Sequence, residues 1–104
     1  FSSVRPDHFG LIDAFPNPFN PQITVPLALP EQSDVQLVIY DILGQEVMSL
    51  VSGHLAAGRH QMIWNGKSSH GKPVASGIYI LSCRVRAIES GKQLNATQKI
   101  LKLE

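Results

Sequence analysis

The chain has 104 residues, which is the length of a single domain. Hydrophobic residues make up 43% of the sequence and charged residues 16%, a balance that favours a packed core over intrinsic disorder. Nine Lys and Arg residues against eight Asp and Glu residues give a formal net charge of +1, so we expect no nucleic-acid partner. The single cysteine rules out an internal disulfide and a cysteine-based zinc cluster.

The sequence also bounds the domain and its relation to a membrane. No apolar run reaches the roughly 18 residues that a membrane helix requires, so we expect no membrane-spanning segment. The chain begins at Phe1 and not at methionine, and we expect it to be a fragment of a longer protein. We expect residues 1–10 to be a linker from an upstream domain and residues 11–104 to form one domain.

Short runs of alternating apolar and polar residues recur along the chain, and proline or glycine separates them. We predict a short strand near residues 11–15, then strands over 23–29, 35–40 and 46–51. Because alternation has the period of an extended strand, each run buries one face in a core. Pro26 removes a ladder hydrogen bond, so we expect the 23–29 strand at a sheet edge or with a bulge.

The middle of the chain combines a tight turn with one aromatic anchor. Asp41 and Gly44 occupy the first and fourth positions of a type I turn, a placement that this turn favours. We predict a glycine- and alanine-rich loop over 53–58 and a strand over 59–64. Trp64 is expected in the centre of the core, because a large aromatic side chain buries the most apolar area.

The last third of the chain shows the clearest alternation. In the strand predicted over 77–87, Tyr79 and Cys83 share the apolar face, which predicts a buried and inert Cys83 thiol. A hairpin turn over 89–92 leads to a returning strand over 94–103. About seven strands at a spacing of roughly 8–12 residues predict an all-β fold, an Ig-like or fibronectin-like sandwich of two antiparallel sheets.

The sequence holds no recognisable pattern of catalytic or metal-binding residues. None of its four histidines stands at the i, i+2 or i, i+4 spacing that directs two imidazoles to one ion, so we expect no metal site. It contains no G-x-S-x-G elbow, no G-x-G-x-x-G fingerprint and no P-loop. Most carboxylates fall in predicted turns or near the termini, where solvated charges are expected. We therefore expect neither enzyme activity nor a cofactor.

The order of several short motifs resembles a known domain family. The motifs are FPNPFNP at 15–21, LPE at 29–31, VIYDILGQEV at 38–47, WNG at 64–66, GKPVASGIY at 71–79 and TQKILKL at 97–103. In this order and spacing the chain resembles the C-terminal sorting domain of the type IX (Por) secretion system, over about residues 13–103. The Ig-like domain of flagellar hook-capping proteins shares the pattern. Asn65 departs from it, since the family usually has Asp there, but either side chain can hold an Asx turn.

The resemblance implies a role in protein transport. Such a domain stands at the C-terminus of an exported protein, which passes through the periplasm and ends at the cell surface or in the medium. The implied partners are the outer-membrane translocon, the sorting and cleavage machinery, and an upstream cargo domain in the same chain.

The resemblance also places recognition in three regions of the chain. The implied recognition residues are Pro16, Asn17, Pro18, Gly77, Tyr79, Lys99, Leu101, Lys102 and Leu103. Trp64, Asp41, Gly44 and Gly66 are interpreted as core and turn residues. The prolines predict an extended, non-pairing opening segment over 15–21. We further expect the last strand to offer an exposed edge to a receptor, by β-augmentation.

Two alternatives stay open. One is a structural Ig-like module, either a flagellar hook-cap domain or a spacer in a multidomain surface protein. The other is an accessory carbohydrate-binding module, which would need exposed aromatic side chains that the predicted strand register does not supply.

Overall fold

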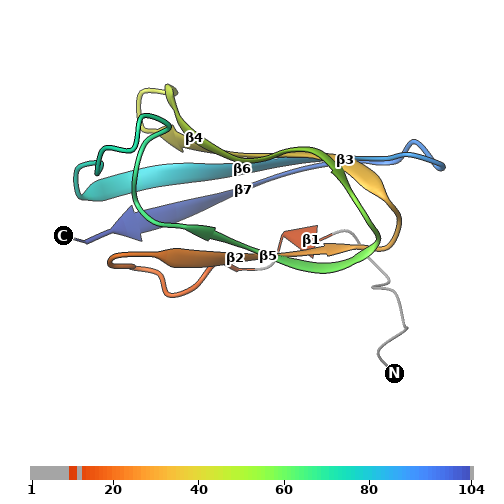
Figure 1. Cartoon of the computed structure of the whole chain (residues 1–104), viewed down its shortest axis with the longest axis horizontal. Coiled ribbons are helices and arrows are strands. Elements are labelled where there is room, and N and C mark those ends of the chain that lie inside the picture. Colours follow the sequence, from red (N-terminus) through yellow and green to blue (C-terminus); the bar gives the residue numbers. More distant parts are fainter. Residues whose placement is uncertain (1–9, 12, 104) are drawn as a thin grey trace.

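The computed structural model describes residues 10–11 and 13–103, and Figure 1 shows them as two stacked sheets. Seven strands and no helix occur within these residues. The strands are β1 (Gly10–Leu11), β2 (Ile23–Leu29), β3 (Ser33–Asp41), β4 (Glu46–Leu55), β5 (Gly58–Trp64), β6 (Gly77–Ala87) and β7 (Gln93–Lys102). The predicted all-β sandwich is confirmed. The expected linker over residues 1–10 lies almost entirely outside the described residues.

All named strand pairs are antiparallel. β1, β2 and β5 form a three-stranded sheet in that order, and the four-stranded sheet has the order β4-β3-β6-β7. The chain crosses between the sheets three times, from β2 to β3, from β4 to β5 and from β5 to β6. The start of β6 and the end of β7 lie at the same end of the four-stranded sheet, because Gly77 pairs with Lys102.

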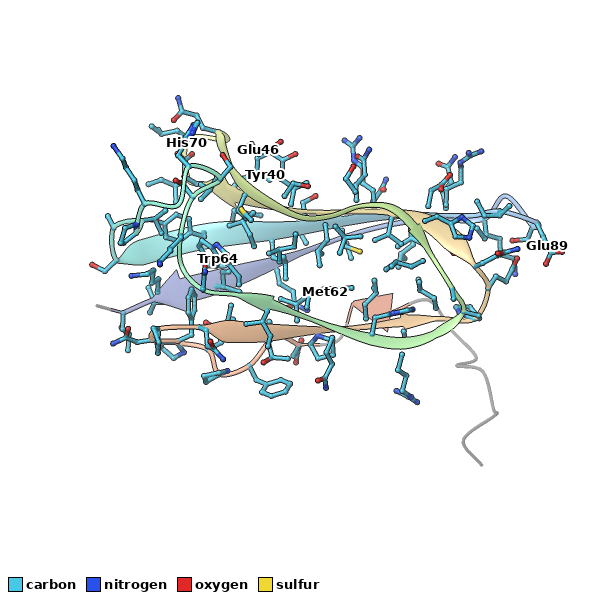
Figure 2. The ribbon with its side chains drawn as sticks, viewed as in Figure 1. Tyr40, Glu46, Met62, Trp64, His70 and Glu89 are labelled. Atoms are coloured by element: carbon cyan, nitrogen blue, oxygen red, sulfur yellow. The ribbon has the colours of Figure 1, made fainter. Side chains whose placement is uncertain are left out.

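The core lies between the two sheets and follows the period-two pattern of the strands. The largest buried side chain is Trp64, whose ring centroid lies 5.5 Å from that of Phe19 and 5.5 Å from that of Tyr79. Tilted and edge-on ring pairs of this kind add to the stabilisation from burial. Figure 2 shows Trp64 between the sheets. The predicted central position of Trp64 is confirmed.

The prediction of an edge position for the Pro26 strand is wrong, although its physical reason holds locally. β2 is the central strand of its sheet, but β1 pairs only with Leu27 and Ala28. Thr24 exchanges backbone hydrogen bonds of 2.7 and 2.9 Å with Phe15 on the same side. Because backbone groups alternate in direction along a strand, Pro26 faces the gap between these two contacts, where its missing N–H costs no ladder bond.

β4 is longer than predicted and absorbs part of the expected glycine- and alanine-rich loop. It continues to Leu55, which pairs with Ser33, because β3 supplies backbone partners along this whole stretch. Only Ala56 and Ala57 separate β4 from β5. The prediction of a loop over 53–58 is therefore wrong for its first three residues and for Gly58, which begins β5.

The predicted turn after β3 is confirmed. Gly44 N donates to Asp41 O at 3.0 Å, and Leu43 N and Gln45 N each donate to Asp41 Oδ1 at 2.9 Å. Gly44 has a φ of 82°, a left-handed conformation that glycine adopts without steric cost. The Asp41 carboxylate is therefore engaged by the turn itself.

Candidate functional site

The opening segment and the last strand, which carry most of the implied recognition residues, lie against each other. Asn17 Nδ2 donates to Lys99 O at 3.1 Å, and Asn17 Oδ1 accepts from Leu101 N at 3.0 Å. One side-chain amide thus bonds a carbonyl and an N–H on the outer edge of β7. It occupies the place of a neighbouring strand there.

Phe19 extends this contact with its own backbone. Phe19 N donates to Leu101 O, and Leu103 N donates to Phe19 O, both at 2.9 Å. The Phe19 ring is buried against Trp64, so the segment is anchored in the core as well as on the strand. We call these contacts of Asn17 and Phe19 with Lys99, Leu101 and Leu103 the terminal-strand clamp.

The expectation that the opening segment does not pair is therefore wrong. Pro16 and Pro18 lack an N–H, and the pairing falls on the residues that flank them. Phe15 pairs with β2, whereas Asn17 and Phe19 bind β7. The prolines set the spacing of the contacts and do not prevent them.

The clamp also corrects the expectation of an open edge on the last strand. Lys99 O, Leu101 N, Leu101 O and Leu103 N all point away from β6, and all are hydrogen-bonded to the opening segment. The backbone N–H and C=O groups of successive residues point to opposite edges of a strand, so those of Asn95 and Thr97 point to the same outer edge of β7 as those of Lys99 and Leu101. No described residue bonds their edge-facing groups, so among the described residues the outer edge is unpaired only along the first half of β7.

The start of β6 lies beside the clamped end of β7. Gly77 pairs with Lys102, and Tyr79 pairs with Ile100. The buried Tyr79 donates its hydroxyl proton to Ala75 O at 2.6 Å. Burial, with the nearby Asp41 charge as a smaller cause, raises the pKa of Tyr79 above its ordinary value. Tyr79 acts here as a core anchor, whereas Gly77 begins β6 opposite Lys102, the last residue of β7.

Gly66 lies close to Lys102 at the same end of the sandwich. A Cβ at Gly66 would lie 2.7 Å from Lys102 Cε and 3.2 Å from Pro21 O, and the φ of Gly66 is 75°. Trp64 Nε1 donates to Lys67 O at 2.9 Å. The WNG motif therefore joins the core tryptophan to the end of the last strand. The predicted Asx turn is also present, since Lys67 N donates to Asn65 Oδ1 at 3.2 Å.

The implied recognition residues thus come together at one end of the sandwich, although they come from three separate regions of the sequence. Pro16 and Pro18 are exposed on either side of Asn17. A depression of about 560 Å³ lies between the opening segment and β7, with Phe15 and Lys99 in its lining. Sequence reasoning missed Gln98, whose Oε1 accepts from Ala14 N at 3.0 Å and ties the segment to β7 once more.

Sequence reasoning also missed Ile78 as a surface residue. It is exposed between the buried Tyr79 and Gly77, and it faces outward directly opposite Leu101. The alternation within the 77–87 strand was the available signal, because a buried Tyr79 requires an outward Ile78. Figure 2 shows Tyr40 and Glu46 on the same outer side of the four-stranded sheet, toward the same end.

Two further findings concern chemistry and membranes. Within the described residues, no group of three or more His, Cys, Asp and Glu side chains is placed to hold a metal ion. Cys83 is buried as predicted, and burial raises its pKa to about 11, so the thiol is neutral at physiological pH. No helix in this part of the chain is long and apolar enough to span a membrane.

Comparisons with known proteins point to a family. A family model described as the FlgD Ig-like domain matches residues 19–90. No curated protein matches the chain. FlgD from P. aeruginosa is similar at 27% identity, with a TM-score of 0.59, over 77% of this chain and 61% of that one. FlgD from Xanthomonas campestris is similar at 21% identity, with a TM-score of 0.61, over 84% of this chain and 61% of that one.

A third solved structure is similar over almost the whole chain. It is PorZ of Porphyromonas gingivalis, described as an essential bacterial surface component of the type-IX secretion system. The identity is 20% and the TM-score 0.54, over 99% of this chain and 12% of that one. At this identity the likeness is one of fold. The chain spans 61% of each FlgD structure and a small part of PorZ, so it corresponds to one portion of each longer protein.

Proposed function

Because this chain belongs to the family of FlgD Ig-like domains, we propose that it is a non-catalytic Ig-like module of a larger, exported protein. The family is a structural one, and the Xanthomonas campestris protein is described in connection with hook capping essential for flagellar assembly. The observation that carries the proposal is the match of the family model to residues 19–90. In this role the rigid sandwich holds its surfaces in place for contact with other proteins.

A specific observation favours a second and narrower function, sorting by the type IX secretion system. The family model ends at residue 90 and begins at residue 19, so it omits most of the opening motif and all of the closing motif. Those two motifs carry the resemblance to sorting domains, and they bind each other through the terminal-strand clamp. A domain that acts only as a spacer does not need contacts between its first and last segments. In a recognition signal, such contacts give the recognised surface a defined shape.

In this second function the domain is the sorting signal for an upstream cargo domain in the same chain. The parent protein crosses the periplasm, and the outer-membrane translocon recognises the clamped end of the sandwich. The sorting and cleavage machinery then acts, and the cargo is placed on the cell surface or released into the medium. Carbohydrate binding has less support, because Trp64 and Tyr79 are buried and offer no platform to a sugar.

One export experiment separates the two functions. Residues 1–104 are fused behind a signal peptide and a fluorescent reporter, in a bacterium that has the type IX machinery and in a mutant that lacks the translocon. Sorting predicts reporter on the surface or in the medium only when the translocon is present. Reporter held in the periplasm of both strains, with the domain folded, would contradict sorting and leave the structural module as the function.

A further inference from the structure

Exposed apolar side chains are concentrated at the clamped end of the four-stranded sheet. Of the eight large hydrophobic side chains exposed in the described part of the chain, five lie there. These five form what we call the terminal patch: Ile42, Leu43, Ile78, Leu101 and Leu103. Isolated exposed hydrophobic residues are ordinary, but a cluster marks an interaction surface.

The strand register explains why these residues meet. Ile78 of β6 and Leu101 of β7 are direct partners, 42% and 36% exposed. The pairing of β3 with β6 ends at Asp41 opposite Tyr79, and Ile42 and Leu43 follow in the turn beyond Asp41 at this end of the sheet. The patch therefore combines a cross-strand pair on the outer face of β6 and β7 with the turn that follows β3.

The positive charge of Lys99 borders the patch on the outer face of β7. Lys99 lies on the outer face two residues before Leu101, and Lys102 packs over Gly66 at the same end. Among residues 10–11 and 13–103, the ion pairs involve only Asp34 at the far end of the sheet, so neither lysine has a carboxylate partner within those residues. Glu46 begins the opposite edge strand, three strand spacings or about 14 Å from Lys99.

The clamp determines what the end of β7 can offer to a partner. Its outer edge is already hydrogen-bonded to Asn17 and Phe19, so an incoming strand would find no free backbone groups there. The side chains of Lys99, Leu101 and Leu103 alternate with the inward Ile100 and face outward. A partner therefore meets a fixed row of side chains and not an open edge.

We infer that the terminal patch is the docking surface for a protein partner with an apolar recess bordered by carboxylates. The inference rests on the proposed sorting function and names the surface that the translocon recognises. Charge complementarity favours such a partner over a second copy, which would bring Lys99 against like charges. An anionic membrane is disfavoured, because membrane attraction needs a larger basic cluster than this chain of net charge +1 provides.

The test uses the reporter fusion and substitutions that keep β-propensity. Leu101→Thr combined with Leu103→Thr is expected to lower the exported fraction about tenfold, and Lys99→Glu is expected to lower it as well. Ile63→Thr and Ile88→Thr, at exposed positions outside the patch, serve as matched controls and are expected to be exported normally. Thermal unfolding of each variant verifies that the fold is retained.

The Ile78→Thr variant distinguishes recognition of a folded surface from recognition of a linear sequence at the end of the chain. Ile78 lies in β6, far from the last residues in sequence, yet it is the direct partner of Leu101. We expect Ile78→Thr to reduce export as strongly as a change at Leu101. Normal export of the folded Ile78→Thr variant, with the wild-type fusion exported, would overturn the inference and leave sorting intact. If the wild-type fusion itself were not exported, the proposed sorting function would be wrong.

Lipid and self-association are checked on the chain alone. We expect no co-flotation with vesicles of phosphatidylcholine and phosphatidylglycerol at about a 3:1 ratio, and sedimentation as a monomer. Flotation or dimer formation that Leu101→Thr with Leu103→Thr abolishes would assign the patch to a membrane or to a second copy. Either result would contradict docking of a protein partner.

Discussion

Asn17 and Leu101 are 84 residues apart in sequence, and the Asn17 side chain accepts a hydrogen bond from the Leu101 backbone at 3.0 Å. The same amide donates to Lys99 O at 3.1 Å. A single side chain thereby joins the beginning of the domain to its last strand. The end of β7 is held in a defined position, and its outward side chains are presented as a fixed row.

The first prediction concerns the clamp itself. Asn17→Ala removes both hydrogen bonds and leaves Lys99 O and Leu101 N without these partners. We expect a loss of about 1–2 kcal/mol in the free energy of unfolding, measured by urea denaturation. The Leu101 amide should also exchange its hydrogen about tenfold faster, whereas the Leu103 amide stays protected by Phe19.

Asn95→Ala is the matched control for this change. Asn95 is an exposed asparagine of β7, the strand that Asn17 binds, and its side chain forms no hydrogen bond to a described residue. We expect its substitution to change stability by less than about 0.5 kcal/mol. Equal effects of the two substitutions would show that the clamp does not stabilise the domain.

The second prediction uses two glycines with similar backbone conformation. Gly66 has a φ of 75° and Gly71 a φ of 80°, but only Gly66 has atoms within 4 Å of the site that a Cβ would occupy. Gly71→Ala should cost about 1–2 kcal/mol from backbone strain alone. Gly66→Ala should cost about 1 kcal/mol more, because the new methyl group meets Lys102 and the backbone oxygen of Pro21.

Thermal or urea unfolding of the two variants measures that difference. Adding Lys102→Ala to Gly66→Ala should recover part of the extra cost, since it removes the nearer of the two contacts. If Gly66→Ala and Gly71→Ala lowered the free energy of unfolding equally, the close approach of Lys102 to the WNG motif would not affect the cost of a side chain at Gly66.

The third prediction concerns the aromatic core. Trp64→Phe shortens the largest buried side chain and leaves Lys67 O without the indole N–H that donates to it at 2.9 Å. We expect a loss of about 1–3 kcal/mol in the free energy of unfolding, followed by far-ultraviolet circular dichroism in urea. The exposed neighbour Ile63, changed to Val, should alter stability by no more than about 0.5 kcal/mol, and a larger loss there than at Trp64 would contradict this picture of the core.

Local pattern was sufficient to predict most strands of this fold. The strand over 77–87 coincides with β6, because its alternation is uninterrupted and its inner face is apolar. The end of β4 escaped prediction, since Gly53 and His54 have the composition of a loop. Their strand conformation depends on pairing with β3, which the local sequence does not contain. A tertiary contact overrode the local signal there.

The family resemblance named the residues of the candidate site, but the sequence did not predict how they are arranged. The family resemblance placed recognition at Asn17 and at the end of the last strand. It could not indicate that these two regions bind each other, because that contact depends on the way the whole sandwich closes. The prolines pointed to an unpaired segment, while the residues that flank them make the contacts. The open edge expected at residues 99–103 was therefore a reasonable but wrong inference from sequence.

The last prediction concerns alkaline stability. Burial raises the pKa of Cys83 to about 11, above the value of about 9 for a thiol in an unfolded chain. Between these values the folded protein retains a proton that the unfolded chain loses, so stability falls as pH rises from about 9 to about 11 and is unaffected below that range. Tyr79, whose pKa is also raised, acts in the same direction. Urea unfolding at a series of pH values should show the decline, and Cys83→Ala should make it shallower. An unchanged slope in Cys83→Ala would mean that the thiol titrates alike in both states, which its complete burial in the core argues against.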